Sequence, residues 1–181
     1  MTDSASAPFD AGLLASQRLG ESDEVLRTSS LADLRTVTDH MASQARSTLR
    51  ILAPDTEPEL YGRDAFADIV GQLIADRPRV ARIRMLVADA TRARHETHRL
   101  VDAWHRFPSF IEIRELRDVY LSTREAFLLV DDTGLIRREA HDNWAAVATY
   151  RNLTTARARA SWFDEAWTHS APCSQLRRLG L

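Results

Sequence analysis

The stretch Ala126-Phe127-Leu128-Leu129-Val130-Asp131-Asp132-Thr133-Gly134 decides the fold of this chain. Its first five residues form a continuous apolar run, which is typical of a strand buried on both faces in the middle of a sheet. The acidic pair and the glycine that follow favour a tight hairpin turn, and residues 135–138 supply the returning strand. The sequence therefore predicts a central strand with an antiparallel neighbour.

Strands and helices alternate before this stretch. Short apolar runs predict strands, and apolar residues at helical spacing predict helices. The expected strands lie at 25–26, 49–52, 81–88, 110–116, 126–130, 135–138 and 145–150, and the expected helices lie at 30–45, 63–75 and 91–107, with a last helix after Asn152 or Thr154. Alternating strand–helix–strand units followed by a hairpin indicate an α/β fold, with a mixed, mostly parallel sheet flanked by helices.

One domain is expected, with a tail at each end. Residues 1–29 are rich in small and polar side chains, and we expect a disordered or loosely ordered tail there. Residues 30–171 form the α/β domain, and residues 172–181 form a C-terminal tail.

The charge and composition exclude several classes of function. The 24 basic residues are all arginine, a usage typical of a GC-rich bacterial genome. Schiff-base chemistry, a P-loop lysine and a lysine general base are therefore excluded. The net charge of −2 favours neither nucleic acid nor membrane as a partner of the whole chain.

The cellular context expected from the sequence is the cytoplasm. The one cysteine, Cys173, cannot form an internal disulfide. The first 20 residues lack the basic start and long apolar stretch of a signal peptide. No apolar run approaches the ~20 residues that cross a bilayer, so we expect no membrane association. We also predict no cofactor.

Three pieces of the sequence resemble one half of the phospholipase D-like superfamily. They are the strand–helix–strand opening from Leu49–Leu52 to Arg82–Val87, the central strand with its acidic turn, and a closing aromatic helix with the spacing Trp162-Phe163-x-x-x-Trp167. The active strand of that superfamily reads HxKxxxxD, with an apolar run between the lysine and the aspartate. The resemblance covers residues 46–170 and implies a phospholipase D-like half as the fold.

The resemblance also shows where this chain departs from the superfamily. With the apolar run as anchor, the superfamily's histidine falls at Arg124, its lysine at Ala126 and its aspartate at Asp131. In the superfamily the histidine forms a covalent phospho-enzyme, and the lysine holds the phosphate. The resemblance therefore implies a non-catalytic domain that acts as a binding or scaffolding module. Because the ancestral site uses two such motifs, it also implies a homodimer or another protein as partner.

Arginines suggest an alternative function in binding phosphate or nucleic acid. Guanidinium groups suit phosphate, and ligands of open α/β sheets bind beyond the carboxyl ends of the strands. The residues proposed for such a groove are Arg84, Arg92, Arg94, Arg124 and Arg138. The competing interpretation is that these arginines are solvated and balanced by nearby acids.

A polar loop after the hairpin supplies two further candidates. Trp144 follows His141-Asp142-Asn143, and a surface tryptophan there would be a binding hot spot together with His141. His141 with Asp131 and Asp142 could also supply a general acid and base, which gives a repurposed hydrolase as a second alternative. No serine or cysteine lies in a recognisable nucleophile elbow.

Histidines and an aspartate share one side of the predicted helix 91–107. They are His95, His98, Asp102 and His105. The spacing fits a polar, solvent-facing side of an amphipathic helix, and the alternatives are a metal site or a pH-sensitive contact face. His95 and His105 lie too far apart along the helix to share one ion, and we predict no metal site.

Overall fold

A computed structural model describes residues 9–91 and 98–173. Its centre is an eight-stranded sheet with the order β1-β7-β6-β5-β2-β3-β4-β8. The strands are β1 (Val25–Thr28), β2 (Thr48–Ala53), β3 (Arg82–Val87), β4 (Ile111–Glu115), β5 (Ala126–Val130), β6 (Gly134–Arg138), β7 (Ala146–Thr149) and β8 (Ala171–Pro172). The predicted α/β class with a mixed sheet is confirmed.

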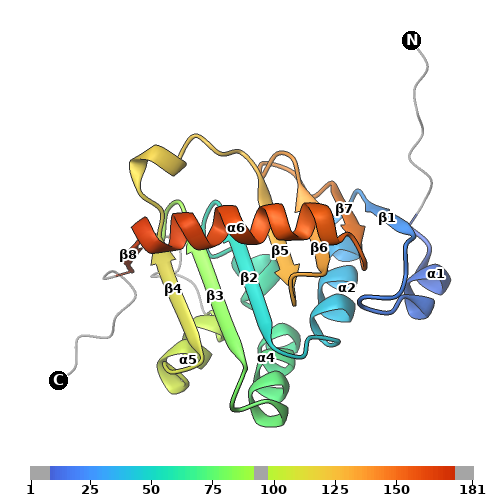
Figure 1. The fold of residues 1–181 in the computed structure, drawn as a ribbon, viewed down its shortest axis with the longest axis horizontal. Coiled ribbons are helices and arrows are strands. Elements are labelled where there is room, and N and C mark those ends of the chain that lie inside the picture. Colours follow the sequence, from blue (N-terminus) through green and yellow to red (C-terminus); the bar gives the residue numbers. More distant parts are fainter. Residues whose placement is uncertain (1–8, 92–97, 174–181) are drawn as a thin grey trace.

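Helices cover both faces of the sheet (Figure 1). The long α6 runs across one face, while α2, α4 and α5 lie behind the other. The described helices are α1 (Ala11–Ser16), α2 (Leu31–Ala42), α3 (Pro58–Tyr61), α4 (Asp64–Asp76), α5 (Arg99–Arg106), the 3₁₀ turn η2 (Asp118–Tyr120) and α6 (Leu153–His169).

The central strand β5 separates two hydrophobic cores. All five of its residues are buried. Leu128 and Val130 belong to the larger core under α2, α4 and α5, whereas Phe127 and Leu129 belong to the core under α6. This alternation follows from the two-residue period of a strand, and it explains why the sequence is apolar at every position of β5.

The strand directions correct one part of the predicted fold. The sheet was expected to be mostly parallel, but only β2–β3 and β3–β4 pair in parallel, and the other five pairings among the described strands are antiparallel. The loop after β4 contains no α-helix that could carry the chain back to the end of the sheet at which β4 began. The chain therefore re-enters the sheet at the end where β4 finished, and β5 runs antiparallel to β2.

The predicted hairpin between β5 and β6 is present. Asp131 and Asp132 both adopt left-handed backbone conformations, with φ of 51° and 53°, and the Thr133 amide donates to the Val130 carbonyl at 3.0 Å. Such a turn matches the twist of two antiparallel strands. Gly134 follows because a Cβ there would lie 2.5 Å from Leu19 Cδ1.

The N-terminal segment is more ordered than its composition indicated. Residues 9–29 contain α1 and β1, and β1 pairs with β7 as an edge strand of the sheet. Leu14 and Leu26 are buried in the larger core. The strand expected at 25–26 is present as β1, whereas α1 is too short for its periodicity to stand out, and the expected tail over residues 1–29 is corrected for its described part.

The C-terminal segment and the third predicted helix also differ from expectation. Cys173 is buried, and β8 pairs with β4, so residues 172–173 belong to the domain. The helix predicted over residues 91–107 is described only as α5, for which His98 is the N-cap. His95 lies outside the described residues. No helix in the described ranges is long and apolar enough to cross a membrane.

Candidate functional site

The carboxyl ends of β2, β3 and β4 form the upper edge of the sheet in Figure 1, and β5 begins there. This is the edge at which open α/β sheets bind ligands. Arg124 and Ala126, at which the resemblance puts the superfamily's histidine and lysine, lie here. Ala126 pairs directly with Arg138 across the hairpin, so both side chains lie on the same face of the sheet.

Arg138 is fully engaged within the protein. Its guanidinium group forms an ion pair with Glu57, and both side chains are only 4% exposed. Arg138 also donates to the carbonyl of Asn143 at 3.2 Å, and its guanidinium carbon lies 5.1 Å from the ring centroid of Trp144. Arg138, which lies beside Ala126, therefore contributes to the packing of the upper edge.

Glu57 is held in an unusual backbone conformation, with φ of 43°. Its amide donates to Asp55 Oδ1 at 2.6 Å, and its carbonyl accepts from the amides of Leu60 and Tyr61 at the start of α3. Burial raises the pKa of Glu57 to about 7, against the opposing effect of the Arg138 charge. Glu57 Oε2 accepts no hydrogen bond within the described residues.

His98 closes the same region from the side of α5. It is buried, and its Nε2 lies 2.9 Å from the Thr56 carbonyl. Because a carbonyl only accepts, Nε2 carries the proton, and Nδ1 accepts from the Val101 amide at 3.4 Å. Burial lowers the pKa of His98. The solvent-facing side predicted for this histidine is therefore wrong, and its role is to hold the loop around Thr56.

Arg124 and the loop after β6 complete the upper edge. The exposed Arg124 pairs with Asp142 at 2.6 Å, and its carbonyl accepts from the His141 amide at 2.8 Å. Trp144 is partly buried against the larger core. The structure thus brings together Arg124, Arg138, His141 and Trp144, and each of these residues contacts other groups of the same edge.

The remaining arginines of the predicted groove do not join this set. Arg84 points to the opposite face of the sheet, where it lies 3.6 Å from Asp164 and 5.2 Å from the ring centroid of Trp167 on α6. Arg92 and Arg94 lie outside the described residues. Among the described arginines, the predicted groove is therefore reduced to Arg124 and Arg138, each with a carboxylate partner.

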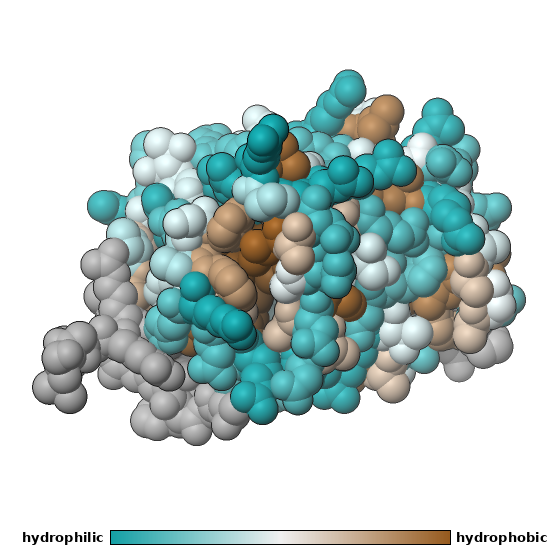
Figure 2. All heavy atoms as spheres, turned by 90° about the horizontal axis from the view of Figure 1, so that it is seen from below, coloured by the Kyte–Doolittle hydropathy of each residue, from teal (hydrophilic) through white to brown (hydrophobic). Residues whose placement is uncertain are grey.

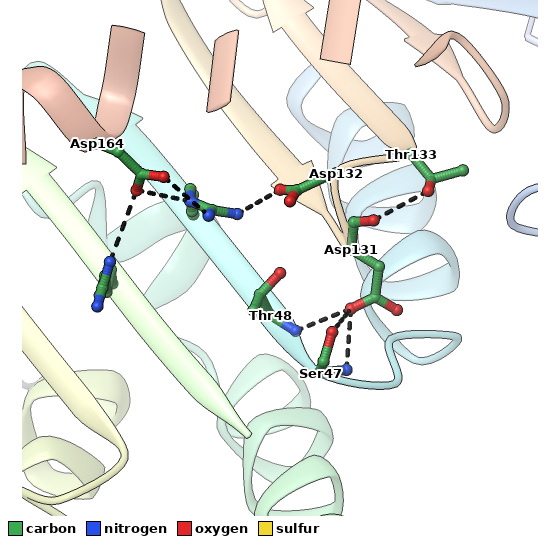
Figure 3. Close-up of polar contacts among 8 residues, drawn as sticks. Ser47, Thr48, Asp131, Asp132, Thr133 and Asp164 are labelled. Atoms are coloured by element: carbon green, nitrogen blue, oxygen red, sulfur yellow. Dashed lines mark hydrogen bonds and ion pairs between the residues drawn. The ribbon is translucent and has the colours of Figure 1, made fainter. Parts of the chain in front are cut away.

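Asp131 lies at the other end of β5, as Figure 3 shows. Its carboxylate accepts from the amides of Arg46, Ser47 and Thr48 at 2.6–2.9 Å, and from the Ser47 hydroxyl. Six residues lie between Asp131 and Arg124, so the two positions are roughly 20 Å apart along an extended chain. Asp131 therefore fastens the hairpin turn to the start of β2, and it faces neither Arg124 nor His141.

Sequence reasoning missed Arg50, the centre of an ion-pair network under α6. Arg50 pairs with Asp132 of the hairpin turn and with Asp164 of α6 (Figure 3). An arginine inside an otherwise apolar strand was the available signal, because a buried charge requires a partner. Arg50 and Arg84 together attach α6 to the sheet through Asp164.

No group of three or more histidine, cysteine, aspartate or glutamate side chains in the described ranges is arranged to hold a metal ion. Asp102 and His105 lie on α5, but the buried His98 at its N-cap does not share their surface. The chemistry of the upper edge is thus that of paired charges and hydrogen bonds.

Comparisons with known proteins establish the fold. The structure is similar to TrmBL2, an archaeal chromatin protein whose structure shows a novel mode of DNA binding, with a TM-score of 0.62 and 14% identity over 84% of this chain. This chain spans about half of that protein, 54% of its length. Nuc from Salmonella typhimurium, a phospholipase D family member, gives a TM-score of 0.59 and 13% identity over 83% of this chain and 98% of its own.

NucT from Helicobacter pylori is similar as well, with a TM-score of 0.56 and 11% identity over 82% of this chain and 99% of its own. The phospholipase D-like fold is therefore shown, as the sequence predicted. A comparison with curated proteins finds no match. A family model described as a domain of unknown function (DUF7931) matches residues 30–179.

Proposed function

Because this chain belongs to the family of domains of unknown function DUF7931 and has a phospholipase D-like fold, we propose that it is a non-catalytic binding module. The observation that carries the proposal is the buried Glu57–Arg138 ion pair beside Ala126. It occupies the face of the upper edge on which the superfamily's lysine position lies. A partner, either a second copy or another protein, would bind the assembled surface.

Two further observations support a non-catalytic role. Arg124 stands where the superfamily has its histidine, and a guanidinium group is too weak a nucleophile to form a covalent phospho-enzyme. Asp131, the one retained position, uses its carboxylate to bind three backbone amides at the far end of β5. The retained aspartate therefore has a structural reason to be present without catalysis.

The test is phosphodiester hydrolysis. We expect purified protein to give no turnover of bis(p-nitrophenyl) phosphate, or of labelled DNA and RNA, above the buffer rate between pH 5 and 9. Turnover that rises linearly with protein concentration and is lost in His141→Ala would overturn the proposal in favour of the repurposed hydrolase. The matched control is His105→Ala, which alters a histidine on α5.

Nucleic-acid binding is a second candidate, favoured by the similarity to TrmBL2, whose structure shows DNA binding. The test is fluorescence anisotropy with labelled DNA and RNA at 50 and 200 mM salt. Binding that weakens steeply with salt supports this candidate, because phosphate contacts release counterions. Absence of binding at the lower salt concentration would leave a protein as the partner.

A further inference from the structure

The lower end of the sheet, where β2, β3 and β4 begin, gathers exposed arginines. Backbone hydrogen bonds place its three loops side by side, since the Arg82 amide donates to the Ser47 carbonyl and the Ile83 amide donates to the Phe110 carbonyl, both at 2.8 Å. The exposed arginines of these loops, called the lower arginine cluster below, are Arg46, Arg77, Arg79, Arg82 and Arg106.

The lower arginine cluster differs from the upper edge in its pairing. At the upper edge Arg124 and Arg138 pair with Asp142 and Glu57. Within residues 9–91 and 98–173, no side chain of the lower arginine cluster forms an ion pair with a carboxylate. Within the described residues Arg82 Nη1 donates to the Ala81 carbonyl at 2.6 Å, and the other guanidinium groups of the cluster have donors available for an external anion.

The acids near the lower arginine cluster fall into two groups. Asp131 is bonded to backbone amides, and Asp132 pairs with Arg50. Asp68 and Asp76 are the acids that line the nearby groove. The chain as a whole has a net charge of −2, so the positive charge at the lower end is local. Local electrostatic fields of this kind attract anionic partners.

A groove of about 530 Å³ opens between the ends of α2 and α4. Its apolar lining comes from Ala42, Ala45, Ile69 and Leu73, and Arg46 and Arg77 stand at its rim. Figure 2 views the molecule from this end and shows apolar side chains in hollows among hydrophilic ones. The apolar floor suits a flat apolar group, and Arg46 and Arg77, which line the groove together with Asp68 and Asp76, supply guanidinium groups for a nearby phosphate.

We propose that the lower arginine cluster and this groove bind single-stranded nucleic acid. The proposal rests on the nucleic-acid candidate above and adds the surface and the strandedness. Arg46, Arg77 and Arg79 bind consecutive phosphates, and an unstacked base enters the groove. Proteins that bind single strands combine a positive track for the backbone with side chains, usually aromatic, against which the bases pack, and in this proposal the aliphatic side chains of the groove take that place. A duplex keeps its bases stacked inside, so it contacts the arginines through its phosphates but places no base in the groove.

A triple variant with a matched control tests the surface. Arg46→Gln/Arg77→Gln/Arg79→Gln removes three charges from the lower arginine cluster, and Arg27→Gln/Arg117→Gln/Arg157→Gln removes three from exposed arginines elsewhere. We expect the first variant to bind a labelled single-stranded 12-mer at least tenfold more weakly at 50 mM salt, and the control to stay within twofold of wild type. The salt slope of log K should fall by about 2, at about 0.7 for each lost phosphate contact.

Strandedness and location are measured on the wild-type protein. A single strand should bind at least fivefold more tightly than a duplex of equal length, and amide chemical shifts should move in residues 43–47 and 68–82. Three outcomes would overturn the proposed surface while leaving nucleic-acid binding itself in place. They are an equal loss of affinity in the two triple variants, tighter binding of the duplex than of the single strand, and amide chemical-shift changes confined to residues 55–57 and 138–144. Absence of oligonucleotide binding would overturn both and leave an acidic peptide as the occupant to test.

Discussion

Arg138 and Glu57 form the most buried ion pair among the described residues. A buried pair is a costly arrangement, because both groups lose their hydration, yet removal of one partner costs more than removal of both. The pair also fixes the ends of two segments, since Glu57 is the N-cap of α3 and Arg138 is the last residue of β6. At the scale of single residues, this pair holds the upper edge together.

Breaking the pair should destabilise the protein strongly. Arg138→Gln leaves the Glu57 carboxylate buried without a counter-charge, and we expect the free energy of unfolding at pH 8 to fall by about 3–5 kcal/mol. Urea unfolding followed by circular dichroism measures this loss. The double variant Glu57→Gln/Arg138→Met should recover most of it, and a single variant that costs less than about 1 kcal/mol would contradict the assigned role.

The pH dependence of stability should carry the signature of Glu57. Its pKa is raised from 4.5 to about 7 by burial, so its contribution to stability is complete below pH 4.5 and is lost as the pH rises through 7. The buried His98 acts in the opposite direction, because its lowered pKa gives a contribution that is present above pH 6.5 and is lost on acidification.

The two groups can therefore be separated by variants. Between pH 5 and 7.5 the free energy of unfolding of Glu57→Gln should fall less with rising pH than that of wild type, by on the order of 1–3 kcal/mol. The variant His98→Gln should instead lose less of its free energy of unfolding than wild type does when the pH is lowered below 6.5. Parallel pH profiles for wild type and Glu57→Gln would show that Glu57 stays ionised over this range.

The β5–β6 hairpin depends on Asp131 at the scale of elements. Its carboxylate binds the backbone amides of residues 46–48, so it joins the turn to the strand β2 that pairs with β5. Its φ of 51° is one that asparagine also tolerates. The side chain thus specifies where β2 begins, and the backbone specifies the turn.

The variant Asp131→Asn should separate these two contributions. The amide keeps the left-handed backbone but replaces an accepting oxygen with a donor that faces backbone amides, so we expect a loss of about 1–3 kcal/mol in the free energy of unfolding. Asp142→Asn is the control, since it alters one exposed ion pair and should cost less than about 1 kcal/mol. Equal costs would argue against an anchoring role for Asp131.

At the scale of the whole molecule, the N-terminal elements complete the sheet. β1 covers one edge of β7, and α1 contributes Leu14 to the larger core. The family model begins only at residue 30, although the sheet of this chain extends beyond that boundary. A chain cut at residue 30 would expose the β7 edge and the apolar surface beneath α1.

We expect a protein that begins at Ser30 to melt at a lower temperature than one that begins at Phe9, and to self-associate. Exposed strand edges pair with other chains, and the loss of the α1 and β1 contacts removes buried apolar area. Differential scanning calorimetry and analytical ultracentrifugation measure the two effects. An unchanged melting temperature with a monomeric short form would show that α1 and β1 are dispensable.

The sequence by itself determined the central strand, the hairpin and the closing helix, because apolar runs, turn residues and caps act between neighbours in the chain. It also predicted the phospholipase D-like fold, which the similarity to Nuc shows. Only the tertiary structure decided which arginines are paired. Arg138 reaches a carboxylate 81 residues away, and Arg50 reaches one 114 residues away. Such distant partners leave no local pattern. The arginines of the lower end, which form no ion pair within residues 9–91 and 98–173, likewise become one surface only when three loops meet.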